Sequence, residues 1–355
     1  MVVYFLIFGL LVASVVYDLP RMSHLSRPRK ERFPLGFLIL LVLFIGLRHE
    51  TGGDWYAYAE KIANVRAEPL LEAILLSDPG YAVINWISAR LFGSVHFVNL
   101  ICALVFCWGL VRFARRIGNT QMVLLLAFPY LVIVVGMGYT RQAAAMGLIM
   151  IGIVGLLNER WLSFIIFVVL ASLFHKSAFF VAVFGALANS KNRIFGIFVT
   201  CLAVGSLYIL IVLESIESFT QNYLEAEYEA SGAWVRVAMT VLPAVMFILF
   251  GRHFGENTVA ARRFWDAFAI GALLLPVAMM VSPSSVVVDR IAIYWYPFQL
   301  MTWASLAKYL PNWRYRYLVT ACLITYAGAS LSVWMFWSPN ALDWIPYRFL
   351  PFEAF

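Results

Sequence analysis

Residues 33–62, "FPLGFLILLVLFIGLRHETGGDWYAYAEKI", pass from a run of apolar side chains directly into a polar stretch. The apolar half is typical of a helix that crosses a membrane, although it is shorter than the roughly 20 residues of a full span. The polar half places four side chains that can bind or react where the chain leaves the membrane: Arg48, Asp54, Tyr56 and Tyr58. The stretch therefore predicts a membrane protein with polar chemistry at one of its faces.

The composition extends this prediction to the whole chain. It has 355 residues, of which 63% are hydrophobic and 13% charged, with a mean hydropathy of +0.84. Soluble domains carry roughly 25% charged residues. Apolar runs predict an all-α integral membrane protein with about 12 helices in a single transmembrane domain, near residues 3–17, 34–47, 80–111, 121–137, 143–157, 161–174, 178–189, 194–213, 235–250, 264–281, 291–307 and 317–337.

The basic residues give an orientation. The loop 18–33, "DLPRMSHLSRPRKERF", is rich in Lys and Arg, so it should face the cytoplasm. The loops that alternate with it hold most of the other basic residues, whereas the opposite set is acidic. The net charge of +7 is therefore an orientation signal, and no nucleic-acid partner is expected. The four cysteines lie in apolar runs without metal-ligand spacing, so neither a disulfide framework nor a zinc site is expected. No metal and no cofactor are predicted.

Several basic residues lie on the outward face, against this bias, at the mouths of the predicted helices. Any one of them could reach lipid headgroups or pair with a neighbouring acid. Together they favour a shared anionic ligand, because guanidinium forks match phosphate oxygens. The candidate phosphate-binding residues are Arg48, Arg141, Lys176, Arg290 and Arg348.

A sugar site is predicted beside them. Gly52 and Gly53 allow a tight turn, so that Arg48 and Asp54 can point into one cavity. Aromatic rings beside a carboxylate suit a sugar, although an interfacial aromatic belt also explains such rings. The candidate sugar-binding residues are Tyr56, Tyr58 and Tyr139, the candidate proton acceptors are Asp54 and His175, and the loops 48–80 and 214–234 are expected to line the cavity.

Ordered motifs carry a family resemblance. The block around Arg48, Gly52, Asp54 and Tyr58 is similar to the signature of EpsG-like polysaccharide polymerases. Further matches follow in order, and together they span most of the chain: "DPGYAVINWI" from 78, "RQAAAMGLIMIGI" from 141, "FHKSAFF" from 174, "DRIAIYW" from 289 and "IPYRF" from 345.

The resemblance implies a glycosyltransferase of the GT-C kind, related to Wzy-type polymerases. Such an enzyme joins polyprenyl-diphosphate-linked oligosaccharide units at the outer face of the bacterial inner membrane. The product would be a capsule, an exopolysaccharide or O-antigen, and a chain-length regulator protein would be a further partner beside membrane lipid. The expected reaction is a metal-independent displacement with inversion, in which the basic residues stabilise the departing diphosphate.

Three other activities stay open at this point. A flippase or transporter would need polar residues through the middle of the membrane. A membrane-bound O-acyltransferase would use His175 but would leave the arginines without a role. An O-antigen ligase performs the same chemistry with a different acceptor, and the residues alone do not separate it from a polymerase.

Overall fold

The computed structural model describes residues 1–22, 35–75, 77–188, 232–254, 258–282, 285–310 and 312–353, together with positions 198, 202 and 205. Most of the predicted run 194–213 and residues 214–231 of the predicted loop lie outside the described residues. The described chain is almost entirely helical, which confirms the predicted all-α class.

Seven of the described helices are long and apolar enough to cross a membrane: Val2–Leu19, Val95–Ile117, Thr120–Gly138, Thr140–Leu157, Ala233–His253, Val259–Val281 and Trp313–Trp337. Shorter apolar helices lie at Leu35–Gly46, Trp161–Ser172 and Lys176–Ala188. The prediction of a multi-pass membrane protein is thus confirmed, while the count of about 12 helices and the GT-C architecture stay predictions.

The chain divides into two compact units. The first comprises residues 1–151, 170–176 and 310–355, and the second comprises residues 152–169 and 177–309. The first unit contains α1 (Val2–Met22), α2 (Leu35–Gly46), β1 (Arg48–His49), α3 (Trp55–Val65), α4 (Leu70–Leu75), α5 (Pro79–Leu91), α6 (Val95–Ile117), α7 (Thr120–Ala127), the π-helix η1 (Phe128–Val135), α8 (Gly136–Gly138), most of α9 (Thr140–Leu157), α17 (Trp313–Trp337), η5 (Pro339–Trp344), β2 (Arg348–Phe349) and α18 (Leu350–Glu353).

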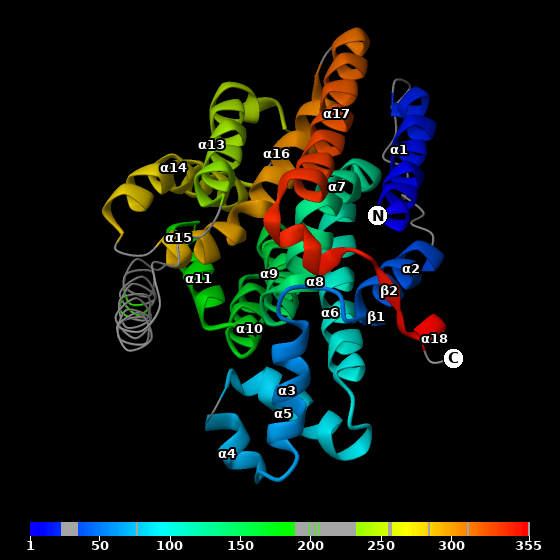
Figure 1. The fold of residues 1–355 in the computed structure, drawn as a ribbon. Helices are drawn as coiled ribbons and strands as arrows, with labels where there is room; N and C mark the ends of the chain where they lie inside the picture. Colours follow the sequence, from blue (N-terminus) through cyan, green and yellow to red (C-terminus); the bar gives the residue numbers. More distant parts are fainter. Residues whose placement is uncertain are drawn as a thin grey trace. The chain divides into compact units, whose positions relative to one another are not determined.

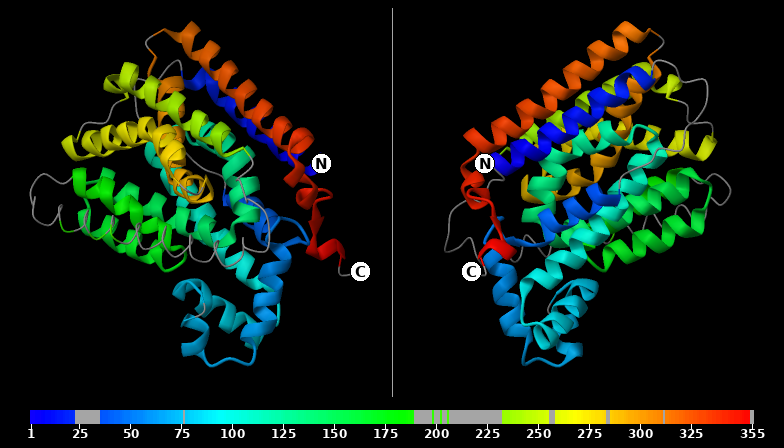
Figure 2. Two further views of the ribbon diagram at one scale, coloured as in Figure 1. Left: turned by 60° about the vertical axis from the view of Figure 1, so that its left-hand side comes forward. Right: turned by 90° about the vertical axis from the view of Figure 1, so that its right-hand side faces the viewer.

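Close helix contacts organise the first unit. A Cβ on Gly147 of α9 would lie 2.6 Å from the Phe106 Cα of α6, so these two helices meet backbone to backbone. Gly46 of α2 packs equally tightly on Leu100 of α6. Small residues allow such approaches between membrane helices. At the other edge of the unit, α1 and α17 run side by side (Figure 2).

A break divides the predicted apolar run 80–111 into two helices. Gly93 has a φ of +61°, which favours glycine, and α5 ends just before it. Ser94 then caps α6, and its side chain accepts a hydrogen bond from the backbone N–H of His96. Because the chain turns here, α3, α4 and α5 form a small helical layer at one end of the first unit (Figure 1).

The second unit contains most of α10 (Trp161–Ser172), η2 (Lys176–Phe180), α11 (Val181–Ala188), α13 (Ala233–Phe250), η3 (Gly251–His253), α14 (Val259–Val281), α15 (Ser285–Ala292), η4 (Ile293–Trp295) and α16 (Tyr296–Tyr309). Its core is aromatic: the Phe184 and Phe268 ring centroids lie 4.1 Å apart. The indole of Trp295 donates to the Phe268 carbonyl at 2.8 Å. These contacts join α11, α14 and η4.

Candidate functional site

Arg48 is the first residue after the α2 helix and its turn, and it is completely buried. Its Nη1 donates to the Ile45 carbonyl at 2.6 Å and its Nε to the Thr51 carbonyl at 3.0 Å. Its Nη2 donates to Thr140 Oγ1 at 2.8 Å and approaches Asn99 Oδ1 at 3.4 Å. Burial lowers the pKa of Arg48 to about 10, so it is still charged at neutral pH. The guanidinium therefore ties α2, the following turn, α6 and α9 together.

The turn after Arg48 is fixed by its glycines and by the C-terminal segment. Gly52 has a φ of +104°, and a Cβ there would lie 2.5 Å from the Met137 carbonyl oxygen. The Gly52 N–H donates to the Asp343 carbonyl at 2.8 Å. Strand β1 pairs antiparallel with β2, with Arg48 opposite Phe349 and His49 opposite Arg348. The predicted turn is thus held by residues almost 300 positions away.

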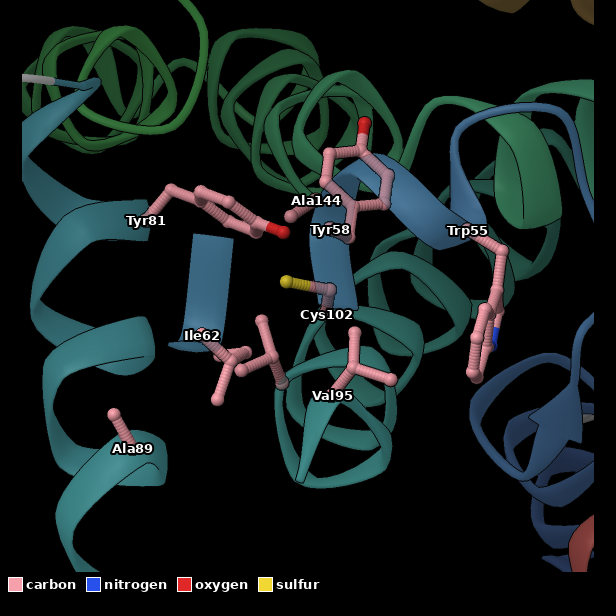
Figure 3. Packing of buried hydrophobic residues seen from close by; sticks show 9 residues of the cluster. Trp55, Tyr58, Ile62, Tyr81, Ala89, Val95, Cys102 and Ala144 are labelled. Carbon is pink, nitrogen blue, oxygen red and sulfur yellow. The ribbon is translucent and has the colours of Figure 1, made fainter. Parts of the chain in front are cut away.

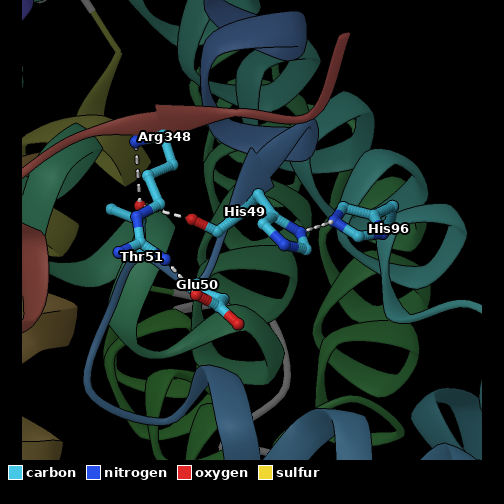
Figure 4. A network of polar contacts seen from close by, with 5 residues as sticks. All are labelled: His49, Glu50, Thr51, His96 and Arg348. Carbon is cyan, nitrogen blue, oxygen red and sulfur yellow. Dashed lines mark hydrogen bonds and ion pairs between the residues drawn. The ribbon is translucent and has the colours of Figure 1, made fainter. Parts of the chain in front are cut away.

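Polar contacts continue along this strand pair (Figure 4). The Thr51 hydroxyl donates to the His49 carbonyl at 2.8 Å and accepts from the Arg348 N–H at 3.3 Å. Arg348 forms an ion pair with Glu50, and both side chains are partly exposed. His49 Nδ1 lies 3.1 Å from His96 Nε2. Arg348 therefore already has a carboxylate partner in the first unit.

Arg141, the second residue of α9, lies at the centre of a charged cluster. Its Nη1 donates to Asp78 Oδ2 at 2.8 Å, where Asp78 is the residue just before α5. The Arg141 side chain is 31% exposed and that of Asp78 only 6%. The guanidinium carbon lies 5.9 Å from the centre of the Tyr81 ring. Arg141 thus combines a buried anchor with a side that solvent or a ligand can reach.

Helix α3 contributes a second row of polar groups to this cluster. Asp54 is the residue just before α3, and its Oδ2 lies 3.4 Å from the Tyr58 hydroxyl. Tyr58 also interacts with Arg141. Burial, and then the Asp54 charge, raise the pKa of Tyr58, so the phenol is protonated at neutral pH and can donate. Lys61 is half-buried on the next turn and interacts electrostatically with Arg141, Asp78 and Asp54.

An apolar layer supports these polar groups (Figure 3). The Tyr58 and Tyr81 ring centroids lie 5.7 Å apart. The Tyr58 hydroxyl points away from the buried Cys102 (Figure 3). The remaining members are apolar and line α3, α5, α6 and α9: Trp55, Ile62, Ala89, Val95, Val98 and Ala144. The polar groups of the Arg141 cluster therefore have packed apolar residues on one side.

The segment that contains His175 and Lys176 is attached to the same place. The Gly80 N–H of α5 donates to the Leu173 carbonyl at 2.7 Å, and the Phe174 ring packs on the apolar layer. His175 is half-buried, and Lys176 is exposed. The segment thus contacts α5 at Gly80, two positions after Asp78, and lies close to the Arg141 cluster.

The other predicted site residues are more scattered. Tyr56 is 63% exposed and, two residues from Tyr58, cannot share its face of α3. Tyr139 is 39% exposed just before α9. Arg290 belongs to the second unit, where it is exposed beside Asp289, whose carboxylate accepts from Arg236 at 2.5 Å. The first unit therefore brings together Asp54, Tyr58 and Arg141, with His175 and Lys176 nearby.

Sequence reasoning missed three members of the cluster: Lys61, Asp78 and Tyr81. A signal for Lys61 existed, because positions 54, 58 and 61 fall on one face of a helix. Asp78 precedes Pro79, a combination that starts a helix and puts the carboxylate at its N-terminus. The signal for Asp78 and Tyr81 was the motif "DPGYAVINWI", which contains both residues but to which no site role was assigned. Among the described residues no group of three or more His, Cys, Asp or Glu could hold a metal ion.

The arrangement can perform two tasks. Arg141 presents several N–H donors of which Asp78 takes one, so the guanidinium can also bind an anion. Asp54 is half-buried beside the Tyr58 phenol and interacts with Lys61, so a carboxylate that can accept a proton lies next to the Arg141 guanidinium's partner Tyr58.

Comparison with known proteins gives one result. The model of the EpsG family matches residues 32–349. The match begins before α2 and ends with β2, so it includes the second unit, most of the first unit without α1, and the whole Arg141 cluster. Neither the curated proteins nor the solved structures include a match to this chain.

Proposed function

The chain belongs to the EpsG family, and from this premise we propose that it polymerises polyprenyl-diphosphate-linked oligosaccharide units at the outer face of the bacterial inner membrane. The family suggests a polysaccharide-polymerase-like role, and a polymerase of this kind acts on lipid-linked oligosaccharide in a membrane. We assign the enzyme to the GT-C kind, with a capsule, an exopolysaccharide or O-antigen as its product and a chain-length regulator as a partner.

The observation that carries this proposal is the juxtaposition of Arg141 with Asp54 and Tyr58. A polymerase has to hold a diphosphate and to deprotonate a sugar hydroxyl within one site. The exposed side of Arg141 supports the first task, because a guanidinium binds phosphate oxygens through parallel hydrogen bonds. Asp54 supports the second task from the adjacent helix start.

The proposed reaction is a single displacement. A hydroxyl oxygen of the acceptor unit attacks the anomeric carbon of the donor glycan and forms the new glycosidic bond. The bond from that carbon to the diphosphate oxygen breaks, and the lipid diphosphate leaves with the electron pair. Asp54 accepts the hydroxyl proton late in the step, since its carboxylate is weakly basic. Arg141 stabilises the charge on the leaving group, which makes a metal or a covalent intermediate unnecessary.

The other predicted site residues have supporting roles in this proposal, or stay candidates. Arg48 positions Thr140 and thereby the start of α9, so it acts on Arg141 through the backbone. Lys176 and His175 support the diphosphate and the acceptor from the segment attached to Gly80. Tyr56, Tyr139, Arg290 and Arg348 stay candidates for contacts with sugar or phosphate.

One observation favours a second candidate, a flippase for lipid-linked oligosaccharide. Helix α16 of the second unit carries Gln299, Thr302 and Ser305, which are spaced three residues apart and buried. Gln299 donates to Thr240 Oγ1 of α13 at 2.8 Å. Buried polar groups along a membrane helix can mark a substrate path. Many charged side chains of the described span candidates nevertheless lie near the helix ends, for example Arg116, Arg141 and Arg314, which favours the polymerase.

The test uses purified protein in lipid nanodiscs and a synthetic polyprenyl-diphosphate-linked repeat unit without added metal. Wild-type protein should give a ladder of products on a gel, and Asp54→Asn should slow its formation by about 100-fold. The matched control is Glu60→Gln, which removes an exposed carboxylate from the same helix and should leave the rate unchanged.

Two results would overturn the polymerase. One is a wild-type protein that forms no ladder with several repeat units but moves the lipid-linked sugar across a liposome bilayer, which identifies a flippase. The other is a single transfer to a separate acceptor without repetition, which identifies a ligase.

A further inference from the structure

We propose that Lys61 is a second diphosphate-binding residue, which acts with Arg141 from the opposite helix. This inference rests on the proposed function, because it names a further ligand for the same substrate group. It concerns a side chain to which the sequence analysis assigned no role, although it lies at the end of the stretch that contains Arg48 and Asp54. The ligand chemistry is a diphosphate, and the source we commit to is the lipid-linked donor.

The position of Lys61 on α3 carries the first step. Asp54, Tyr58 and Lys61 follow one another at spacings of four and three residues, which places them along one face of the helix. That face is turned toward α5, because Tyr58 is buried there and its ring contacts Tyr81 at 5.7 Å between centroids. Lys61 therefore reaches the site from the side of α3, whereas Arg141 reaches it from α9.

The electrostatic surroundings carry the second step. Burial, followed by the positive charge of Arg141, lowers the pKa of Lys61, while Asp78 and Asp54 oppose this shift. Two cations that are close enough to repel each other gain from an anion between them. A diphosphate supplies that anion, and an ammonium group has three donors and no acceptor, so it suits phosphate oxygens.

The two carboxylates leave room for such a ligand. Asp78 takes only the Nη1 donor of Arg141 and is itself buried, so it anchors the guanidinium from below. Asp54 is engaged with the Tyr58 hydroxyl. Lys61 is half-buried, with its ammonium at the end of a flexible stem that can turn toward a ligand. The site would thus bind a diphosphate between two cations: Arg141, which Asp78 holds in place, and Lys61, whose flexible side chain can adjust its position.

The experiment measures diphosphate binding directly and separately from polymerisation. Isothermal titration of the full-length protein in nanodiscs would use inorganic pyrophosphate, farnesyl diphosphate and orthophosphate as probes. The variants are Lys61→Met, which keeps the length of the side chain, and Lys61→Arg, which keeps the charge. Arg66→Met is the matched control, because Arg66 is an exposed cation at the end of the same helix.

Farnesyl diphosphate should bind wild-type protein, and Lys61→Met should raise its dissociation constant by about tenfold. The dissociation constant of Lys61→Arg should stay within about threefold of the wild-type value. That of Arg66→Met should equal the wild-type value. Because the pKa of Lys61 is lowered, wild-type binding should weaken on raising the pH through that pKa, while Lys61→Arg should keep binding. Burial raises the pKa of both Tyr58 and Tyr81, so the phenols do not titrate over this range.

The proposal fails if Lys61→Met and Arg66→Met bind equally well, or if farnesyl diphosphate does not bind wild-type protein. Binding of pyrophosphate and orthophosphate alone would point to free phosphate and would overturn the lipid source. A protein that binds farnesyl diphosphate through Lys61 but forms no polymer ladder would instead contradict the proposed function and leave this inference standing. An unfolding temperature close to that of wild type for Lys61→Met shows that lost binding is not lost folding.

Discussion

Arg48 and Arg141 are two arginines of the same unit with opposite environments. Arg48 is completely buried, and its described hydrogen bonds all go to uncharged acceptors. The side chain of Arg141 is 31% exposed, and its partner is a carboxylate. Both were expected to bind the same diphosphate.

The difference separates a residue that builds the site from one that can act in it. A guanidinium that is surrounded by protein acceptors has no donor turned to solvent, so a ligand could reach it only after the surrounding contacts had broken. Arg141 keeps one side open and is anchored by Asp78 on the other. The two are connected, because Arg48 binds Thr140, which precedes Arg141 in α9. We therefore expect Arg48 to contribute to the site through the position of Arg141.

The largest effect should come from Arg48→Met. The substitution leaves buried acceptors on Ile45, Thr51 and Thr140 without their donor, and each such loss costs about 1–3 kcal/mol. We expect the free energy of unfolding to fall by more than about 3 kcal/mol, with a much lower yield of folded protein. Thermal unfolding in detergent and the yield after size-exclusion chromatography measure this.

The matched control is Arg66→Met, whose side chain is exposed at the end of α3. It should leave the unfolding temperature almost unchanged. If Arg48→Met instead folds normally but loses activity, Arg48 touches the substrate and the distinction from Arg141 collapses.

Arg141 should show the reverse pattern, with a large loss of activity and a small loss of stability. We expect Arg141→Gln to slow polymer formation by about 100-fold, as the loss of one charge-stabilising donor usually does. Because it leaves Asp78 buried without its cation, the double variant Asp78→Asn/Arg141→Gln should unfold at a higher temperature than Arg141→Gln. The double variant should remain inactive.

Rates of ladder formation and unfolding temperatures of the wild type and the two variants decide this point. Recovery of activity in the double variant would mean that the unpaired Asp78, rather than the missing guanidinium, caused the loss.

The sequence indicated the neighbourhood of the site better than the roles within it. The turn after α2 was predicted from Gly52 and Gly53, and the grouping of Asp54 with Tyr58 follows from local spacing along α3. The burial of Arg48 was not predictable in this way, because its partners Asn99 and Thr140 are 51 and 92 positions away. Whether a guanidinium points into protein or into water depends on such distant contacts.

The break after α5 shows a second limit of prediction from the sequence, in which a local signal was present but was not used. Hydropathy alone joined residues 80–111 into one run, because apolar side chains continue through the turn. The local signals were Gly93 and the capping Ser94. They decide the position of α5, and therefore the position of Asp78 opposite Arg141, but they leave the partner of Asp78 open.

The next smaller effect concerns the turn that supplies an acceptor to Arg48. Gly52→Ala forces a side chain into a backbone conformation with φ at +104° and brings Cβ to 2.5 Å from the Met137 carbonyl oxygen. We expect a loss of about 2 kcal/mol in unfolding free energy. Gly53→Ala is the control, since its nearest neighbour, Asp343 Oδ2, lies at 3.4 Å.

Thermal unfolding of both variants tests this expectation. A Gly52→Ala protein that is as stable as Gly53→Ala, yet inactive, would show that the turn serves Asp54 more than the contacts of Arg48.

Substitution of Arg348 should have the smallest effect on stability. It tests whether Arg348 binds the substrate, as proposed for Arg141, or only stabilises the fold, as expected for Arg48. Its pairing with Glu50 is partly exposed on both sides, and such pairs contribute less than about 1 kcal/mol. The backbone pairing of β1 with β2 holds this segment without either side chain, so Arg348→Gln and Glu50→Gln should both unfold close to the wild-type temperature.

The KM for the lipid-linked donor then separates the two possibilities. If Arg348 belongs with Arg141, Arg348→Gln raises KM by about tenfold, whereas Glu50→Gln lowers it because the competing carboxylate is gone. If Arg348 only fastens the strand pair, both variants keep the wild-type KM, and the phosphate contacts of the first unit are confined to the α3–α9 side of the turn.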